Sequence, residues 1–368
     1  MAELLIVLIP IMQEAFGWNL ARAKCAAGIT LALIKVRTVN LVQIALALPG
    51  DAKKESKYRR IQRFFSEIHI DTETLAKFII TQLPLSKYAL LIDRTNWKFG
   101  KTYQNILFIA ISYNGFTIPI LHIILPQSKK SGNTNTQERI ELLQRFIKVF
   151  GSSVIEYFVG DREFVGKVWF MFLIDNNINF RIRIKCNTKI SRANGKYSKA
   201  KNLFRDLRPG EAKQLDGKRE VFGIELYVTG MKLPSGELLI IVSHDSASYT
   251  EVLNDYKKRW GIECLFKELK SQGSDFETTH LTDPKKIDTL IAFMTIACVW
   301  ACKTGQWLNN EKEIPIKEHG RKEISIFRYG LDYLREIFLN IEAKISQSLV
   351  VLEFIRMGSV PIKCVLNC

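Results

Sequence analysis

The order of the apolar runs between residues 87 and 185 constrains the fold more than any other feature of the chain. Three runs, "YALLIDRT", "NILFIAISYN" and "FTIPILHIIL", are separated by turn-prone residues such as Asn114 and Gly115 and predict a three-stranded meander. Helical spacing follows in "QERIELLQRFIKVFG", then a strand in "VIEYFVGD", a second helix in "FVGKVWFMFLIDNN" and a strand in "NFRIRIK". The resulting order, β-β-β-α-β-α-β, indicates an α/β fold.

Two acidic residues stand where apolar strands end: Asp93 closes "YALLID" and Asp161 follows "VIEYFVG". Either one alone is most often a strand-end cap or a turn residue, because an isolated buried carboxylate is costly. The strand order, however, resembles a ribonuclease-H-like core, in which the first and fourth strands are neighbours. In such a core Asp93 and Asp161 would lie side by side, and only the final helix, expected near residue 250, is still missing.

The stretch "YKKRWGIECLFKELK", residues 256–270, supplies that helix and a further carboxylate. At about 100° of rotation per residue, four of its side chains fall within roughly 40° of one another. Its apolar residues centre about 90° away, so the stripe lies at the edge of the buried face, where a helix meets the sheet that it covers. We therefore predict a functional site along the stripe of Tyr256, Arg259, Glu263 and Lys270.

Asp93, Asp161 and Glu263 would repel one another at close range unless divalent cations neutralised them. Oxygen ligands alone favour Mg²⁺ or Mn²⁺ over zinc. Two such ions about 3.5–4 Å apart can activate a water or a 3′-hydroxyl and stabilise the leaving oxygen in phosphodiester cleavage. Chemistry on DNA would also give roles to the rest of the stripe, with Arg259 and Lys270 holding phosphates and Tyr256 adding a hydrogen bond.

The charge of the chain favours a polyanionic partner. Its 368 residues include 53 Lys and Arg against 37 Asp and Glu, a net charge of +16, with a pI near 9.5. From Arg181 to Arg219, 13 basic residues face three acidic ones, so 13 − 3 = +10 of that charge lies in one stretch. Nucleic acid is the default partner for such a chain.

A basic helix is also expected near the N-terminus. Residues 1–80 read as helical, with a helix that ends before Pro49 and a second, "SKYRRIQRFFSEI", that begins after a possible cap at Ser56. On this second helix the basic residues stand at spacings of three and four. DNA contact and an ordinary solvated face are both open interpretations of Arg59, Arg60 and Arg63.

At this point the chain resembles the DDE transposases of bacterial insertion sequences, specifically the insertion-sequence-four group. The signature of that group is Tyr, two residues, Arg, three residues, Glu, six residues, Lys, which 256–270 reproduces without a change in spacing. The contexts "LIDRTNWKFG" and "VGDREFVGKVWF" are similar to the two aspartate regions of the family, and "TTHLTDP" fits as well.

The resemblance implies an enzyme that cuts the DNA at transposon ends and joins the freed 3′-hydroxyls to target DNA. Catalysis by Asp93, Asp161 and Glu263 with two Mg²⁺ or Mn²⁺ ions is implied, as are terminal inverted repeats and target DNA as double-stranded partners. A homodimer would bring two ends together. A sequence-specific DNA-binding protein or a nuclease derived from a transposase is the alternative.

The sequence divides into five expected parts, with a ribonuclease-H-like core interrupted by a β-rich, basic insertion between its fifth strand and last helix. They are a helical DNA-binding domain at 1–82, the first part of the core at 83–185, the insertion at 186–249, the last part of the core with the glutamate helix at 250–284, and a helical C-terminal region at 285–368.

The remaining signals concern the compartment. Seven dispersed cysteines without metal-ligand spacing are expected to be reduced thiols, as in the bacterial cytoplasm. No signal peptide is expected. The longest apolar run, "TLIAFMTIACVWA", is shorter than the roughly 20 residues that a membrane span requires, so no membrane partner is expected either.

Overall fold

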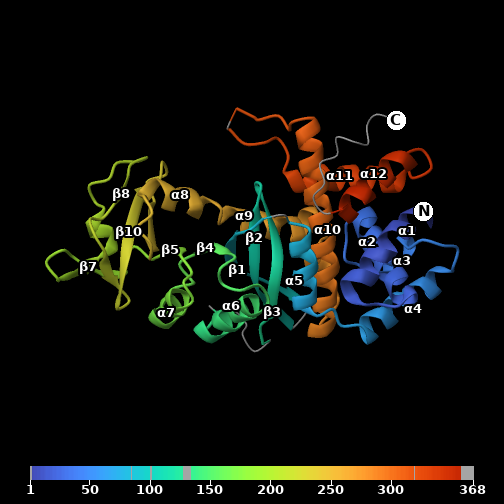
Figure 1. Ribbon diagram of the computed structural model, residues 1–368, viewed down its shortest axis with the longest axis horizontal. Coiled ribbons are helices and arrows are strands. Elements are labelled where there is room, and N and C mark those ends of the chain that lie inside the picture. Colours follow the sequence, from blue (N-terminus) through green and yellow to red (C-terminus); the bar gives the residue numbers. More distant parts are fainter. Residues whose placement is uncertain (1, 84, 100–101, 127–133, 319, 358–368) are drawn as a thin grey trace.

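The computed structural model describes residues 2–83, 85–99, 102–126, 134–318 and 320–357 (Figure 1). Its centre is a mixed sheet in which the first five strands follow the order β3-β2-β1-β4-β5. β2 is antiparallel to both β1 and β3, whereas β1, β4 and β5 run parallel. The meander and the adjacency of the first and fourth strands are as predicted, and the order fits a ribonuclease-H-like core. The strands are β1 (Tyr88–Phe99), β2 (Thr102–Tyr113), β3 (Phe116–Ile124), β4 (Ile155–Gly160) and β5 (Phe180–Arg183).

Two of the four predicted helices of this region begin at a residue whose side chain caps them. Before α6, the Asn135 side chain accepts from the Glu138 amide while the Glu138 side chain accepts from the Asn135 amide, a complete capping box. Ser248 is the N-cap of α8 and, like Asn135, has an extended backbone conformation. The predicted helices are α6 (Thr136–Phe150), α7 (Lys167–Asp175), α8 (Tyr249–Lys257) and α9 (Trp260–Lys267).

The segment after β5 is rich in strands, as predicted, but it does not form a separate sheet. β11 pairs antiparallel with β5, and β10 pairs with β11, so the core sheet continues outward into a sheet of eleven strands. The alternation of apolar and polar residues along the sequence cannot predict this pairing, because it indicates which residues form strands and not which strands lie next to each other. The added strands are β6 (Lys189–Ser191), β7 (Tyr197–Lys199), β8 (Ala212–Gln214), β9 (Arg219–Val221), β10 (Ile224–Lys232) and β11 (Leu238–Ser243).

The N-terminal and C-terminal helices pack together. In Figure 1, α10 lies between the sheet and α1 to α4, whereas α5 lies on the sheet side of α10; α10 contacts α2, α4, α5 and β3. α1 contacts α12, and α2 contacts α11. The two ends of the chain therefore build one helical layer beside the sheet. Its members are α1 (Ala2–Phe16), α2 (Leu20–Val36), α3 (Leu41–Ala47), α4 (Lys54–Glu67), α5 (Thr72–Thr81), α10 (Pro284–Glu311), α11 (Ile326–Leu339) and α12 (Ile345–Met357).

One local prediction about these helices was wrong. α4 begins at Lys54 with Lys53 as its N-cap, so Ser56 lies inside the first turn and does not cap the helix. The run "TLIAFMTIACVWA" belongs to α10, whose 28 residues make it long and apolar enough to cross a membrane by length and composition. The bent pair of α1 and α2 passes the same test. Because 94% of the most apolar window of α10 is buried inside the protein, its apolar character is accounted for by packing.

Among the described residues, five cysteines are free thiols: Cys25, Cys186, Cys264, Cys298 and Cys302. Cys364 and Cys368, which the sequence also predicts to be reduced, lie outside the described residues.

Candidate active site

The carboxylates of Asp93 and Asp161 meet at the same end of two neighbouring parallel strands. Ile92 of β1 pairs with Gly160 of β4, so the aspartates stand one residue further along each chain. Burial raises the pKa of Asp93 to about 6; the backbone amide of Arg94, 2.7 Å away, and Arg259 oppose the rise, and the charge of Asp161 adds to it. The two carboxylates are therefore neighbours in a site that favours the neutral form of one of them.

The buried atoms of this site that lack a hydrogen bond of normal geometry include Oδ1 of Asp161, the hydroxyl of Tyr256 and Nε of Arg94. Burial raises the pKa of the Tyr256 phenol, and Asp161 is close enough to raise it further. Buried polar atoms in folded proteins are nearly always paired with protein or solvent, because desolvation without compensation is costly. The free oxygen of Asp161 beside Asp93 is available to a ligand.

The residues that follow the aspartates brace the two strand ends. Nε of Arg94 lies 3.4 Å from Oε1 of Glu163, and the same oxygen accepts from the Thr134 amide at 2.9 Å. The brace fixes the segment after β4 to the strand that carries Asp93. Sequence reasoning missed this pair. Its signal was a basic residue directly after the first aspartate and an acidic residue two positions after the second.

Glu263 is held by Arg259 in this structure. Nη2 of Arg259 lies 2.5 Å from Oε1 of Glu263, and the Arg259 side chain is only 15% exposed. Arg259 also acts on the charges of Asp93 and Asp161. The guanidinium therefore links the aspartate pair with the glutamate. Within the described part of the chain, no three His, Cys, Asp or Glu side chains are grouped closely enough to hold a metal ion.

The prediction that Tyr256, Arg259, Glu263 and Lys270 form one stripe on a single regular helix is wrong in part. α8 ends at Lys257 and α9 begins at Trp260. At the junction, backbone hydrogen bonds join residues three apart instead of four, such as the bond from Gly261 N to Lys258 O at 2.9 Å. From Glu268 to Gln272 the backbone continues as a π-helix, η2. Each change alters the rotation per residue, so a constant 100° does not carry the stripe to its last member.

Lys270, the last member of the stripe, lies in η2 and not in a regular α-helix. Its Nζ donates to the backbone oxygen of Asn96 at 3.0 Å and lies 2.8 Å from Oε1 of Glu277. Asn96 belongs to β1, three residues after Asp93. Lys270 is thus attached to the strand that carries the first aspartate.

A groove of about 1160 Å³ borders α9 and reaches the turn between β2 and β3. Glu263 lines it, and so does Trp260, whose large side chain is 56% exposed. The groove is also lined by basic residues: Lys257, Lys258, Lys267, Arg321 and Lys322. A basic groove with an exposed aromatic ring next to a carboxylate site suits the backbone and bases of DNA.

The structure does not bring Arg59, Arg60 and Arg63 to the carboxylates. All three are exposed on α4, and in Figure 1 α4 lies on the other side of α10 from the sheet. Arg59 and Arg63 line a shallow surface hollow with Gln62 and Ser66. Any DNA contact they make is separate from the site of chemistry.

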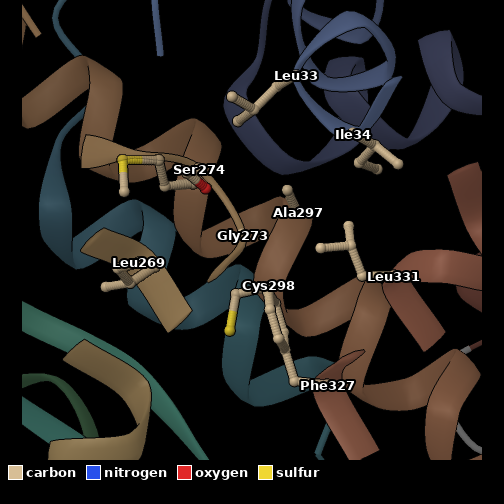
Figure 2. A pocket seen from close by; sticks show the side chains of 10 residues that line it. Leu33, Ile34, Leu269, Gly273, Ser274, Ala297, Cys298, Phe327 and Leu331 are labelled. Carbon is tan, nitrogen blue, oxygen red and sulfur yellow. The ribbon is translucent and has the colours of Figure 1, made fainter. Parts of the chain in front are cut away.

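A small apolar cavity lies between α2, α10 and α11 (Figure 2). Leu33 and Ile34 approach it from α2, and Phe327 and Leu331 from α11. Ser274 supplies a lone hydroxyl. The cavity lacks charged groups and belongs to the packing of the helical layer.

One buried carboxylate near the groove gives a pH prediction. Burial raises the pKa of Glu268 from 4.5 to about 7, against the effect of a hydrogen bond with Ser325. The folded protein then binds this proton more tightly than the unfolded chain, so stability falls as the pH rises from about 4.5 through 7. At pH 8 the ionised Glu268 lowers the free energy of unfolding by about 3 kcal/mol. We expect Glu268→Gln to remove this pH-dependent loss of stability.

Urea unfolding at pH 5 and pH 8 measures this effect. Glu323→Gln is the matched control, because Glu323 is half exposed in a surface pair with Lys317. An equal pH dependence in wild type and Glu268→Gln would contradict the assignment.

Paired carboxylates at the ends of parallel strands, with a glutamate on a nearby helix, form a candidate site on a sheet whose strand order fits a ribonuclease-H-like core. The family described as "Transposase DDE domain" matches residues 84–300, more than half of the chain, and this range includes Asp93, Asp161 and Glu263. The chain belongs to this family of DDE transposases.

Among solved structures, the chain is similar to one titled "Cryo-EM structure of piggyBac transposase synaptic complex with hairpin DNA". The match has 12% identity and a TM-score of 0.46, over 98% of this chain and 83% of the other. A search of curated proteins returned no match.

Proposed function

We propose that this transposase cuts DNA at the ends of its own insertion sequence and joins the 3′-hydroxyl ends to target DNA. We also assign it to the insertion-sequence-four group, on the spacing of Tyr256, Arg259, Glu263 and Lys270. The observation that carries the proposal is the buried, unpartnered Oδ1 of Asp161 beside Asp93, within a DDE transposase domain.

Asp93 and Asp161 suit a hard divalent cation. Both offer oxygen, one oxygen lacks any partner, and a cation would lower the raised pKa of Asp93. We propose that Glu263 completes the site by exchanging Arg259 for the cation. When bound, two Mg²⁺ or Mn²⁺ ions supply an activated water or 3′-hydroxyl and a stabilised leaving oxygen.

The remaining residues of the site would hold the substrate. Once Glu263 leaves, the Arg259 guanidinium is free to take a DNA phosphate in its place, because both are oxyanions of similar geometry. Lys270 would exchange Glu277 for a phosphate in the same way. The unpartnered Tyr256 hydroxyl can donate to the same strand.

The proposed partners are double-stranded terminal inverted repeats and target DNA, in the bacterial cytoplasm, with a homodimer holding two ends. The helical domain at 1–82 would recognise the ends. The core at 83–185 and 250–284 would carry the chemistry, the basic insertion at 186–249 would follow the DNA, and the C-terminal region at 285–368 would support the helical layer.

The proposal is tested with a plasmid carrying the DNA that flanks the coding region. Full-length protein with Mg²⁺ should cut at the boundaries of the element, and sequencing of the products should show 3′-hydroxyl ends joined to new sites. Binding of these boundaries without cutting in Mg²⁺ or Mn²⁺ would favour a DNA-binding protein, and cutting without joining would favour a nuclease.

End recognition by α4 gives a separate prediction. Deleting 1–82 would remove packing against α10, such as the contact of Phe64 with Phe293, so point changes are preferable. The triple change of Arg59, Arg60 and Arg63 to Ala should lower the preference for element ends over random DNA at least about 10-fold. Competition gel shifts measure it.

The control for that experiment is Lys54→Ala, an exposed charge at the start of the same helix. If the triple variant keeps the preference of wild type, end recognition lies elsewhere, and the basic stretch from Arg181 to Arg219 is the next place to examine.

A further inference from the structure

A third charged residue stands in register with the two aspartates. Ile92 pairs with Gly160, and Gly160 pairs with Ile182, so the next residues along β1, β4 and β5 are Asp93, Asp161 and Arg183. In parallel strands, residues in register point to the same face. Arg183 therefore extends the row of active-site side chains by one strand.

The surroundings of Arg183 support this placement. Burial would lower the pKa of Arg183, but its hydrogen bond with Glu237 and the nearby Tyr256 and Asp161 raise the value above its ordinary one. The Arg183 side chain is 17% exposed, whereas that of Glu237 is 55% exposed. The Arg183 guanidinium is thus mostly buried at the end of β5, next to the site. The carboxylate of Glu237, its partner, lies on the solvent side of the pair.

Glu237 lies in the turn between β10 and β11, where the Leu233 amide donates to its backbone oxygen at 2.8 Å. It pairs with Arg183 in the same way that Glu263 pairs with Arg259 and Glu277 with Lys270. The carboxylates that pair with Arg183, Arg259 and Lys270 are each at least one-third exposed, whereas Glu163, the partner of Arg94, is 18% exposed. A carboxylate on a guanidinium occupies the place that a phosphate would take.

We infer that Arg183 is a further DNA-phosphate contact of this active site and that Glu237 covers it until DNA displaces the carboxylate. The inference rests on the proposed function and deepens it. Its consequence is that the two partners of one ion pair have opposite effects on DNA binding. A pair that serves only to stabilise the fold would not behave in this way.

The test measures binding of full-length protein to a short duplex of mixed sequence, by fluorescence anisotropy at several salt concentrations. Arg183→Ala should bind about 10-fold more weakly, with a log-log salt slope reduced by about 0.9. Glu237→Gln should bind about 2- to 5-fold more tightly, because an exposed ion pair no longer has to be broken.

The matched controls are Arg328→Ala and Asp332→Asn. They change the same charges in an exposed ion pair on α11, 2.5 Å apart, away from the basic stretch. Melting temperatures are recorded for all variants, and Arg183→Lys keeps the charge while removing the fork of the guanidinium.

Opposite shifts larger than those of the two controls support the inference. Shifts equal to the controls, with a lower melting temperature in both Arg183→Ala and Glu237→Gln, would overturn it. The proposed function fails separately, if wild type binds the duplex but shows no metal-dependent cutting of element ends.

Discussion

Asp93→Asn, Asp161→Asn and Glu263→Gln should each lower Mg²⁺-dependent DNA cleavage at least about 1,000-fold, because each removes a charge that the cations require. Binding of element ends should change little. Asp161→Asn should not destabilise the fold, because Oδ1 of Asp161 is buried without a partner and the amide removes a repulsion with Asp93. Cleavage and gel shifts are measured on the same preparations.

Asp71→Asn is a suitable control for these changes. Asp71 caps α5 through the Thr74 amide at 2.8 Å, and an asparagine oxygen can accept the same bond, so this change should leave both the fold and cleavage largely intact. Cleavage at the level of wild type by any of the three site variants would remove that residue from the catalytic set.

Arg259→Ala should reduce strand cleavage about 100-fold and lower the log-log salt slope of binding by about 0.9. The guanidinium acts on the charges of both aspartates and pairs with Glu263, so a phosphate held by it would lie beside these carboxylates. Arg259→Lys separates charge from geometry, because it should keep the salt slope and still lose most of the cleavage. Lys270→Ala should also lower the slope.

A purely structural role for Arg259 predicts a different pattern. If it only pairs with Glu263, the alanine variant should melt at a lower temperature with the salt slope of wild type. Loss of cleavage with both melting temperature and slope unchanged would also argue against a phosphate contact.

The strand order and the aspartate pair were predictable because both depend on local patterns. Apolar runs of strand length ended at Asp93 and Asp161, and the order of elements placed those strands together. The buried face of the helix was also predictable, since its apolar residues Ile262, Leu265 and Leu269 are buried.

The details of the site depend on contacts between distant segments and were not predictable. The π-helical turn places Lys270 on the Asn96 carbonyl, 174 residues away, which helical periodicity cannot report. Arg183 was visible only as part of a basic stretch. Its signal was a basic residue at every second position of "RIRIK", on a strand that is otherwise apolar.

The sequence also could not predict that the helices from both ends of the chain pack into one layer. α2 is buried along nearly its whole length, from Ala23 to Ile34, which indicates a core helix but not its partners. Those partners include α10 and α11, which follow more than 240 residues later.

The most direct measurement is a crystal structure of the full-length protein with element-end DNA and Mn²⁺, with the metal located by anomalous scattering. The proposed function predicts a peak about 2.1 Å from oxygens of both Asp93 and Asp161, with Glu263 released from Arg259 and a DNA phosphate in its place. A complex that cuts its DNA while Oδ1 of Asp161 remains without a metal, or with Mn²⁺ bound elsewhere, would contradict it.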